Sequence, residues 1–441
     1  MSTGELAGFA SVFRQTGWTM RQMAQAVNRV GTERGTPLQY KAPSVHQWCR
    51  GALPREDVRP LIVEALSRHL RRPVSPTELG FPAPSDHVSQ RPSTVDELLD
   101  LGRQDMDPSR RGVIGAGLFS VAMSVPGWQD VVGRMEAVQK GNARRIGAQD
   151  VEIVRKMTDR FSELEDDFGG RLARPMAAAF MVNTVVPYLK ADASDAIRKE
   201  MLSASAFLSY LTGWMAVDEG LHNLAQRYYR TGLEFAGAAS DHNTYCHVLR
   251  GMSVQAVDLG HGAPAARLAA SAAAIAPSTG PRMTAFMEGQ QAHALAVAGD
   301  KAGALRALHV TERAVSQAES AAGTFGGYSG ATLAYHTAQV RYALGDVAGS
   351  VASLEDHFRL RDSTDSQVSN LRFSSMLAER RLEMGHLEAA CATWGAVLDQ
   401  HPTMHSDRVD RHVRQITARL KPYRTAPAAR DIYARALEAA A

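Results

Sequence analysis

The chain has 441 residues, more than a single hydrophobic core usually accommodates, so two or more domains are expected. Its 45% hydrophobic and 22% charged residues are ordinary for a soluble globular protein, and no apolar run is long enough to span a membrane. Three cysteines, Cys49, Cys246 and Cys391, lie far apart, which excludes a disulfide framework or a paired zinc motif and indicates a reducing, cytoplasmic setting.

Helix is the secondary structure that the composition favours. Aromatic residues make up only 7%, and alanine occurs in runs such as AASAAAIA (269–276). Alanine has the highest helix propensity, and β-branched residues do not dominate the sequence. We therefore expect an all-α protein, with an N-terminal helix-turn-helix domain followed by an α-solenoid of helical hairpins.

Charge is distributed unevenly along the chain. Residues 1–82 contain eleven Lys or Arg and six Asp or Glu, a formal net charge of +5, whereas the whole chain has +3. A small basic module attached to a nearly neutral remainder is typical of a nucleic-acid-binding domain joined to another function.

Two helices around a long turn are predicted in this basic segment. The first lies within TGWTMRQMAQAVNRV (16–30), with Thr19 as N-cap, and Gly31, Gly35 and Pro37 are expected to end it and form the turn. The second is APSVHQWCRG (42–51), which Pro43 opens and Gly51 closes. A third, amphipathic helix is expected over 56–73 and a short closing helix over 75–81.

The polar positions of the segment 42–51 form the candidate DNA-binding face. Val45 and Trp48 should anchor this helix to the core, so that His46 and Gln47 meet base edges in the major groove. Basic residues around it should contact phosphates and set the register. The predicted DNA-binding residues are Arg21, Gln22, Lys41, Ser44, His46, Gln47, Arg50 and Arg55.

GWTMRQMAQAVN followed by YKAPSVHQWCRGALPR resembles the helix-turn-helix of the XRE family, in an actinobacterial variant with a long turn. The resemblance implies a transcriptional regulator that binds double-stranded DNA as a homodimer. Met20 stands where the family usually has glutamine, and Ala42 and Pro43 stand where an arginine and a hydroxyl residue are common. The alternative is a small helical docking module that touches no DNA.

Residues 83–149 are interpreted as linker and connector. PAPSDHVSQRPS (82–93) is rich in proline and serine, and a helix could start within STVDELLDL. From Asp150 the helical pattern is clear: helices are expected over 151–170 and 174–190, and two further segments over 194–220.

A repeat is predicted from five glycines that each end a helical segment. They are Gly220, Gly260, Gly299, Gly345 and Gly385. The residues five positions after and seven positions before them are all small, which would let the two helices of a hairpin approach closely. Residues 150–441 are therefore predicted to form a repeat domain.

This arrangement is similar to that of tetratricopeptide (TPR) repeats, most closely in LGDVAGSVASL (344–354) and AGDKAGALRAL (298–308), with a capping helix at 407–423. The resemblance implies a concave groove for a peptide, a small molecule or a protein partner. The residues predicted to line it are Phe207, Tyr210, Trp214, His247, Arg250, Phe286, His293, Tyr335, Gln339 and Arg372.

Catalysis is not expected. HNTYCH (242–247) brings two histidines and a cysteine together but lacks further metal ligands, and EDD (165–167) is interpreted as a solvated helix face. No cofactor or metal is predicted. The favoured hypothesis is a sequence-specific regulator whose repeat domain dimerises and senses a ligand; the alternative is a TPR adaptor or scaffold whose N-terminal module docks on protein.

Overall fold

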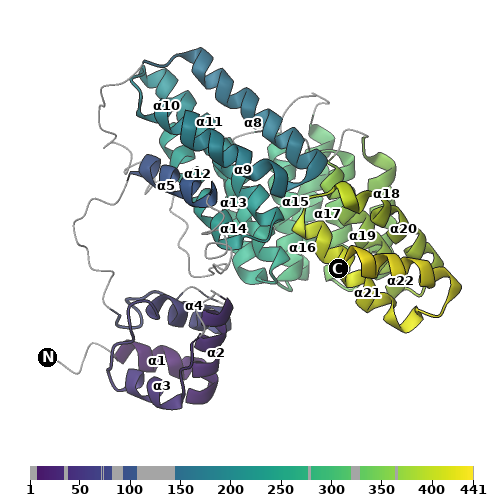
Figure 1. Cartoon of the computed structure of the whole chain (residues 1–441), viewed down its shortest axis with the longest axis horizontal. Coiled ribbons are helices and arrows are strands. Elements are labelled where there is room, and N and C mark those ends of the chain that lie inside the picture. Colours follow the sequence, from purple (N-terminus) through teal and green to yellow (C-terminus); the bar gives the residue numbers. More distant parts are fainter. Residues whose placement is uncertain are drawn as a thin grey trace.

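The computed structural model describes residues 7–33, 38–70, 72, 74–81, 93–106, 145–276, 280–318, 328–362 and 366–440. Within these ranges the chain is helical and contains no strand, only an isolated bridge between Arg145 and Asp192. The all-α prediction is confirmed. Figure 1 shows a small N-terminal bundle, here called the head (residues 7–81), and a long array of helices, here called the body (residues 93–440).

The head contains α1 (Ala7–Gln15), α2 (Met20–Glu33), α3 (Ala42–Cys49) and α4 (Arg59–Leu70). One hydrophobic core holds them together, and Val45 and Trp48 belong to it, as predicted. The Phe9 ring meets the Trp48 indole edge-on, with centroids 6.1 Å apart, so α1 packs directly behind α3.

Two expectations for the head are wrong. Gly31 does not end the first helix, because α2 continues to Glu33; Gly35 and Pro37 lie outside the described residues. Residues 76–80 form turns instead of a closing helix, since Leu79 and Phe81 donate their amides back to Pro76 and leave no room for a regular helical ladder.

Part of the predicted connector belongs to the body. Helix α5 (Thr94–Met106) buries Val95, Leu98 and Leu101 in the body's main core. At its end Asp105, fully buried, forms an ion pair with Arg174 and accepts a hydrogen bond of 2.8 Å from the Tyr228 hydroxyl. A buried charge requires such partners, so α5 is fixed to the body by electrostatics as well as by packing.

The body continues with α8 (Ala148–Phe168), α9 (Gly170–Phe180), a π-helical turn (Met181–Val185), α10 (Val186–Lys190) and α11 (Asp195–Asp218). The π turn ends two positions before Pro187, which has no N–H to donate to the preceding turn, so the backbone widens there. The two segments expected over 194–220 are a single 24-residue helix, α11.

Five helical hairpins follow, and a predicted glycine stands at the turn of each. They pair α11 with α12 (His222–Ala239), α13 (His242–Asp258) with α14 (Gly262–Ile275), α15 (Pro281–Val297) with α16 (Lys301–Gln317), α17 (Gly330–Ala343) with α18 (Val347–Leu360), and α19 (Gln367–Glu383) with α20 (Leu387–Gln400). All five glycines have φ between 73° and 88°, a left-handed conformation that favours glycine.

The small residues predicted on either side of each glycine face each other across the hairpin. All ten are buried. Ser253 donates to the carbonyl of Ala265 at 2.9 Å, and Ser350 donates to that of Ala338 at 2.7 Å. These contacts join the position seven before a glycine to the position five after it, which confirms the repeat frame.

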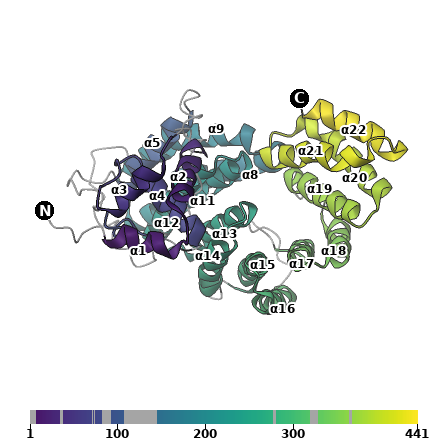
Figure 2. The ribbon, with the colours of Figure 1, turned by 90° about the horizontal axis from the view of Figure 1, so that it is seen from below.

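The array ends in α21 (Asp407–Leu420) and α22 (Pro427–Ala439), and its end returns to its beginning. In Figure 2, α11, α13, α15, α17 and α19 follow an arc, and α8 and α21 lie across its open side. Helix α8 packs against both α11 and α19. The body is therefore a closed ring of helices rather than an open superhelix with a free cap.

Candidate functional site

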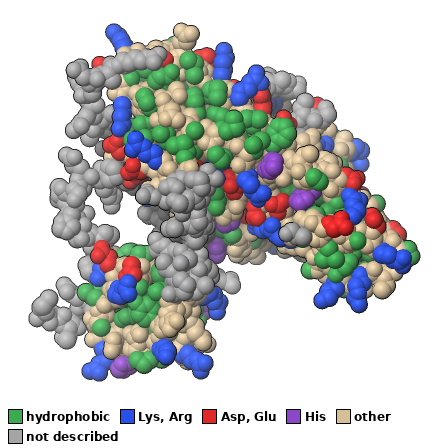
Figure 3. All heavy atoms as spheres, in the orientation of Figure 1, with side chains coloured by type: hydrophobic (Ala, Val, Ile, Leu, Met, Phe, Trp, Pro, Cys, Tyr) green, Lys and Arg blue, Asp and Glu red, His purple; other side chains and the backbone are tan. Residues whose placement is uncertain are grey.

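Two surfaces carry the predicted functional residues, and the first is the exposed face of α3. Lys41, His46, Gln47 and Arg50 are exposed, while Ser44 is half-buried. Figure 3 shows Lys, Arg and His side chains along the lower edge of the head, where Figure 1 places α3. The helix presents these polar groups together because Val45 and Trp48 hold its other side in the core.

The entry to α3 is fixed by Asn28, a residue that the sequence interpretation did not single out. Its side-chain amide donates to the Tyr40 carbonyl at 2.9 Å, and its oxygen accepts from the Tyr40 amide at 2.8 Å. The Tyr40 ring also meets Trp48, with centroids 5.1 Å apart. Asn28 therefore sets where Lys41 and the first turn of α3 lie.

Two of the predicted DNA contacts are already engaged within the head. The side-chain oxygen of Gln22 accepts from the backbone N–H of Thr19 at 2.8 Å, and the backbone N–H of Gln22 donates to the Thr19 hydroxyl at 3.3 Å. The pair therefore forms a capping box. Arg55 forms an ion pair of 2.6 Å with Asp57.

The second surface is the side of α11, α13, α15, α17 and α19 that faces into the ring, and it is here called the inner face. A continuous series of ring contacts follows it. Phe207 meets His247 at 5.9 Å, His247 meets Phe286 at 5.4 Å, and Tyr335 stacks on Phe373 at 4.0 Å between centroids. The aromatic residues predicted to line the groove are thus brought together from helices far apart in the sequence.

The side-chain amide of Gln339 is not free to bind a ligand, because it already has partners within the chain. Its oxygen accepts from Arg380 at 2.6 Å, and its nitrogen lies 3.1 Å from the Met376 sulfur. Trp214 is covered on one side by Arg408, whose guanidinium carbon lies 4.7 Å from the ring centroid. The Trp214 side chain as a whole is partly exposed.

Several polar atoms of the inner face have no hydrogen-bond partner. They include Nδ1 of His247, Nε of Arg250 and Nε of Arg372. The exposed fractions of His247 and Arg372 are 5% and 7%, so water does not readily replace a partner. Arg250 is partly exposed and lies over the Phe286 ring at 3.8 Å. These groups therefore have hydrogen-bonding capacity that the described residues do not use.

Burial controls the charge of the histidines here. It lowers the pKa of His247 and of His293 to about 4, and neighbouring Arg250 adds to this effect at both. Both side chains are therefore neutral at pH 7, where each can donate one hydrogen bond and accept another.

The ring is closed by a group of contacts here called the seam, formed by residues 168–171, Asp218 and residues 405–410. The amide of His405 donates to the Phe168 carbonyl at 2.6 Å. Asp218 accepts from the Gly170 amide at 3.0 Å and from the Ser406 hydroxyl at 2.6 Å. Arg408 forms an ion pair with Asp258, which extends the closure to α13.

Glu165, one residue of the predicted solvated EDD face, is buried beside the seam, with an exposed fraction of 5%. Burial raises its pKa well above the usual range, and Asp166 and Asp218 raise it further. The sequence pattern misses this because α8 is amphipathic toward α9 and α11, whereas Glu165 is buried by the returning C-terminal part of the chain.

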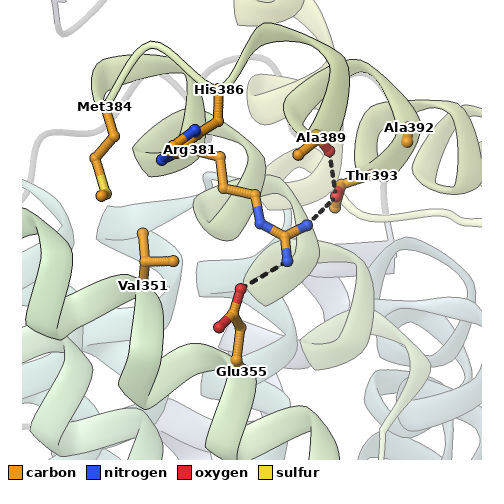
Figure 4. A pocket seen from close by; sticks show the side chains of 8 residues that line it. All are labelled: Val351, Glu355, Arg381, Met384, His386, Ala389, Ala392 and Thr393. Atoms are coloured by element: carbon orange, nitrogen blue, oxygen red, sulfur yellow. Dashed lines mark hydrogen bonds and ion pairs between the residues drawn. The ribbon is translucent and has the colours of Figure 1, made fainter.

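A separate pocket of about 620 Å³ lies on α18–α20, and Figure 4 shows its lining. Arg381 stands at its centre, but its guanidinium already binds the Glu355 carboxylate at 2.8 Å and the Thr393 hydroxyl at 2.8 Å. With its central cation neutralised, this pocket has less to offer a charged ligand than the inner face.

Other site types find no support in the described ranges. No group of three or more metal-ligating side chains is present among the residues that the structure describes. Cys246 of the HNTYCH segment is buried and directs its thiol toward the Ala272 carbonyl, 3.6 Å away, whereas His242 is exposed. None of the helices described is both long and apolar enough to cross a membrane.

The fold and its two surfaces define the class of protein: an all-α chain with a helical-repeat body. Among known families, a model described as the SP15 N-terminal domain matches residues 9–82, the segment that holds α1–α4. None of the curated proteins compared with the chain matches it.

A solved structure similar to the chain is described as a kinesin light chain with nearly identical TPR-like repeats, from Podosopora anserina. It is 15% identical, covers 45% of this chain and 96% of its own, and has a TM-score of 0.34.

Proposed function

We propose that this protein is a non-catalytic binding protein, an adaptor whose helical ring holds a partner molecule on its inner face. One observation carries the proposal. Aromatic rings and unpartnered polar atoms from five different helices converge on the inner face, and several of these side chains remain partly exposed. Rigid aromatic rings and a few unsatisfied polar groups are the features of ligand and peptide sites.

Site-specific photo-crosslinking tests this proposal. A benzophenone amino acid replaces Tyr335 on the inner face, and in a matched variant it replaces Tyr423, a 40% exposed tyrosine near the C-terminus. We expect a discrete adduct from position 335 that is absent from position 423. Equal labelling at both positions contradicts an inner-face site. So does the absence of an adduct at position 335 when the crosslinking is carried out inside the cells that express the protein.

A second candidate function, sequence-specific DNA binding by the head, is favoured by the exposed polar face of α3. His46, Gln47 and Arg50 lie on one side of a helix that its core residues hold rigidly, and residues 1–82 carry a formal charge of +5. The resemblance to XRE-type helix-turn-helix proteins supports the same function. A homodimer would place two heads on half-sites spaced by whole turns of DNA.

A mobility-shift titration separates the two candidates. If the head reads DNA, Gln47→Ala should weaken binding to the chain's own promoter by roughly tenfold, since a good base contact contributes about 1–3 kcal/mol. Arg50→Ala should also weaken binding to the promoter, through the loss of a phosphate contact. Lys41→Ala should weaken specific and random sequences equally. Arg72→Ala, whose guanidinium is held by Glu78 at 2.6 Å, is the matched control.

Binding that is indifferent to Gln47 and Arg50, or that competitor DNA removes completely at about 0.15 M salt, would assign the head to protein docking.

A further inference from the structure

The inner face contains more positive charge, on buried and partly exposed arginines, than the carboxylates around it neutralise. Arg250 and Arg372 form no ion pair in the described structure, and the Nε atom of each has no hydrogen-bond partner. Arg380, with an exposed fraction of 4%, donates to Ser350 at 2.7 Å and to Gln339 at 2.6 Å, both uncharged. Among the described residues, none of these three guanidinium groups forms an ion pair with a carboxylate.

These cations act on the same region. His293 on α15 lies within electrostatic range of Arg250, Arg372 and Arg380, and Tyr335 lies within range of all three arginines. They come from α13 and α19, so the ring closure brings the charges together around the partly exposed His293 and Tyr335 side chains.

The carboxylates nearby already have hydrogen-bond or ion-pair partners at the seam. Asp258 forms an ion pair with Arg408, and Asp218 accepts hydrogen bonds from Gly170 and Ser406. Burial raises the pKa of Glu165, which favours its neutral form. Asp258 and Asp218 lie within electrostatic range of Arg372, but among the described residues neither forms an ion pair with Arg372 or with Arg250.

An uncompensated buried charge is destabilising, and a counter-ion with good hydrogen-bond geometry offsets that cost. Guanidinium groups bind carboxylate and phosphate oxygens through pairs of parallel N–H donors. Phe286 under Arg250 and the stacked pair Tyr335–Phe373 add flat apolar surface next to those donors. The complementary molecule has both a negative group and an apolar body.

We propose that the inner face is a site for an organic anion, an apolar or aromatic molecule with a carboxylate or similar acidic group, held by Arg250 and Arg372. This inference rests on the proposed function, because it names the chemistry of the molecule that the ring would hold.

Two fluorescent probes of matched shape test the proposal. One is 8-anilino-1-naphthalenesulfonate, an aromatic anion, and the other is N-phenyl-1-naphthylamine, which lacks the sulfonate. We expect the full chain to bind the anion at one saturable site about tenfold more tightly than the neutral probe, the difference that one charge-assisted contact supplies.

Variants locate the effect on the two arginines. Arg250→Gln and Arg372→Gln should each weaken binding of the anion about tenfold and leave binding of the neutral probe unchanged. Arg381→Gln, in the outer pocket, is the matched control and should change neither. Near-ultraviolet circular dichroism establishes that each variant is folded, and Arg250→Lys, which keeps the charge, should retain more affinity than Arg250→Gln.

If a glutamine variant does not fold, the wild-type chain still gives the answer. Added salt should weaken binding of the anionic probe and leave the neutral probe unaffected. The anion site is overturned if the two probes bind with equal affinity, or if neither Arg250→Gln nor Arg372→Gln weakens binding of the anion. Either result would still allow a neutral ligand on the inner face. If neither probe binds, this inference fails; the proposed function fails only if crosslinking at position 335 is negative as well.

Discussion

At the scale of single residues, His247 and His293 on the inner face make the stability of the ring depend on pH. The pKa values of His247 and His293 are lowered to about 4 in the folded chain, against 6.5 for an unperturbed side chain. Above pH 6.5 the side chains are neutral in both states, and their contribution to stability is complete. Below pH 6.5 the unfolded chain takes up protons that the folded chain does not, so stability falls as the pH approaches 4.

This gives a prediction for His247→Gln. Between pH 7 and pH 5 the wild-type chain should lose on the order of 1–2 kcal/mol of unfolding free energy per buried histidine. Over the same pH interval, the unfolding free energy of His247→Gln should fall by about 1–2 kcal/mol less than that of the wild-type chain, as measured by urea unfolding. His309→Gln, whose side chain is 66% exposed, should follow the wild-type curve. An identical pH dependence in His247→Gln and wild type would show that His247 is not buried as a neutral side chain.

The individual residues that sequence could predict are those whose role follows from local spacing. Val45 and Trp48 are three positions apart on one short helix, so their burial and the exposure of His46 and Gln47 follow from helical periodicity alone. Asn28 and Glu165 could not be found this way. Asn28 acts on Tyr40, twelve positions later, and the charges that act on Glu165 include Arg372 and Arg408, more than two hundred positions later in the chain.

At the scale of helices, close contact within each hairpin depends on the small residues flanking the turn glycine. Ala338 on α17 is completely buried, and its carbonyl accepts from Ser350 on α18 at 2.7 Å. A larger side chain there would force the two helices apart, because packed interiors do not expand without strain.

Ala338→Leu should therefore lower the unfolding free energy by about 1–3 kcal/mol. Ala343→Leu, an exposed position on the same helix, is the matched control and should change it by less than about 0.5 kcal/mol. Urea unfolding followed by circular dichroism compares the two. Equal effects at both positions would contradict close packing at the site of Ala338.

The end of a helix could be predicted where one residue determines the backbone conformation. It could not be predicted where packing against distant parts of the chain determines it. The five turn glycines end their helices because each adopts positive φ. Gly31 does not end α2, since glycine tolerates a helix when tertiary contacts favour it. The same reason explains why α11 is one helix and why α5, expected in a connector, is buried: partners distant in sequence decide both.

At the scale of the whole molecule, the closed ring is the feature that sequence could not predict. Helical repeats indicate a curved array, but its curvature depends on small rotations at every hairpin. The ion pair of 2.9 Å between Arg171 and Asp410 joins residues 239 positions apart, and no local sequence pattern predicts it. The inner face is enclosed because these two ends meet.

The proposed functions differ in which part of the molecule carries them. An inner-face ligand needs only the ring, whereas DNA binding needs only the head. Regulation would need a coupling between them, so that a ligand changes the affinity of the head for DNA by a measurable factor. Titrating promoter DNA with and without the anionic probe measures that factor directly.

Closure of the ring is the central claim, and a distance between its two ends tests it most directly. Cysteines replace Leu172 on α9 and Arg414 on α21, both exposed, in a chain with Cys49→Ser, and carry spin labels for double electron–electron resonance. A closed ring should give one narrow distribution at the short end of the measurable range. A broad distribution at long distances, as an open superhelix would give, would contradict it.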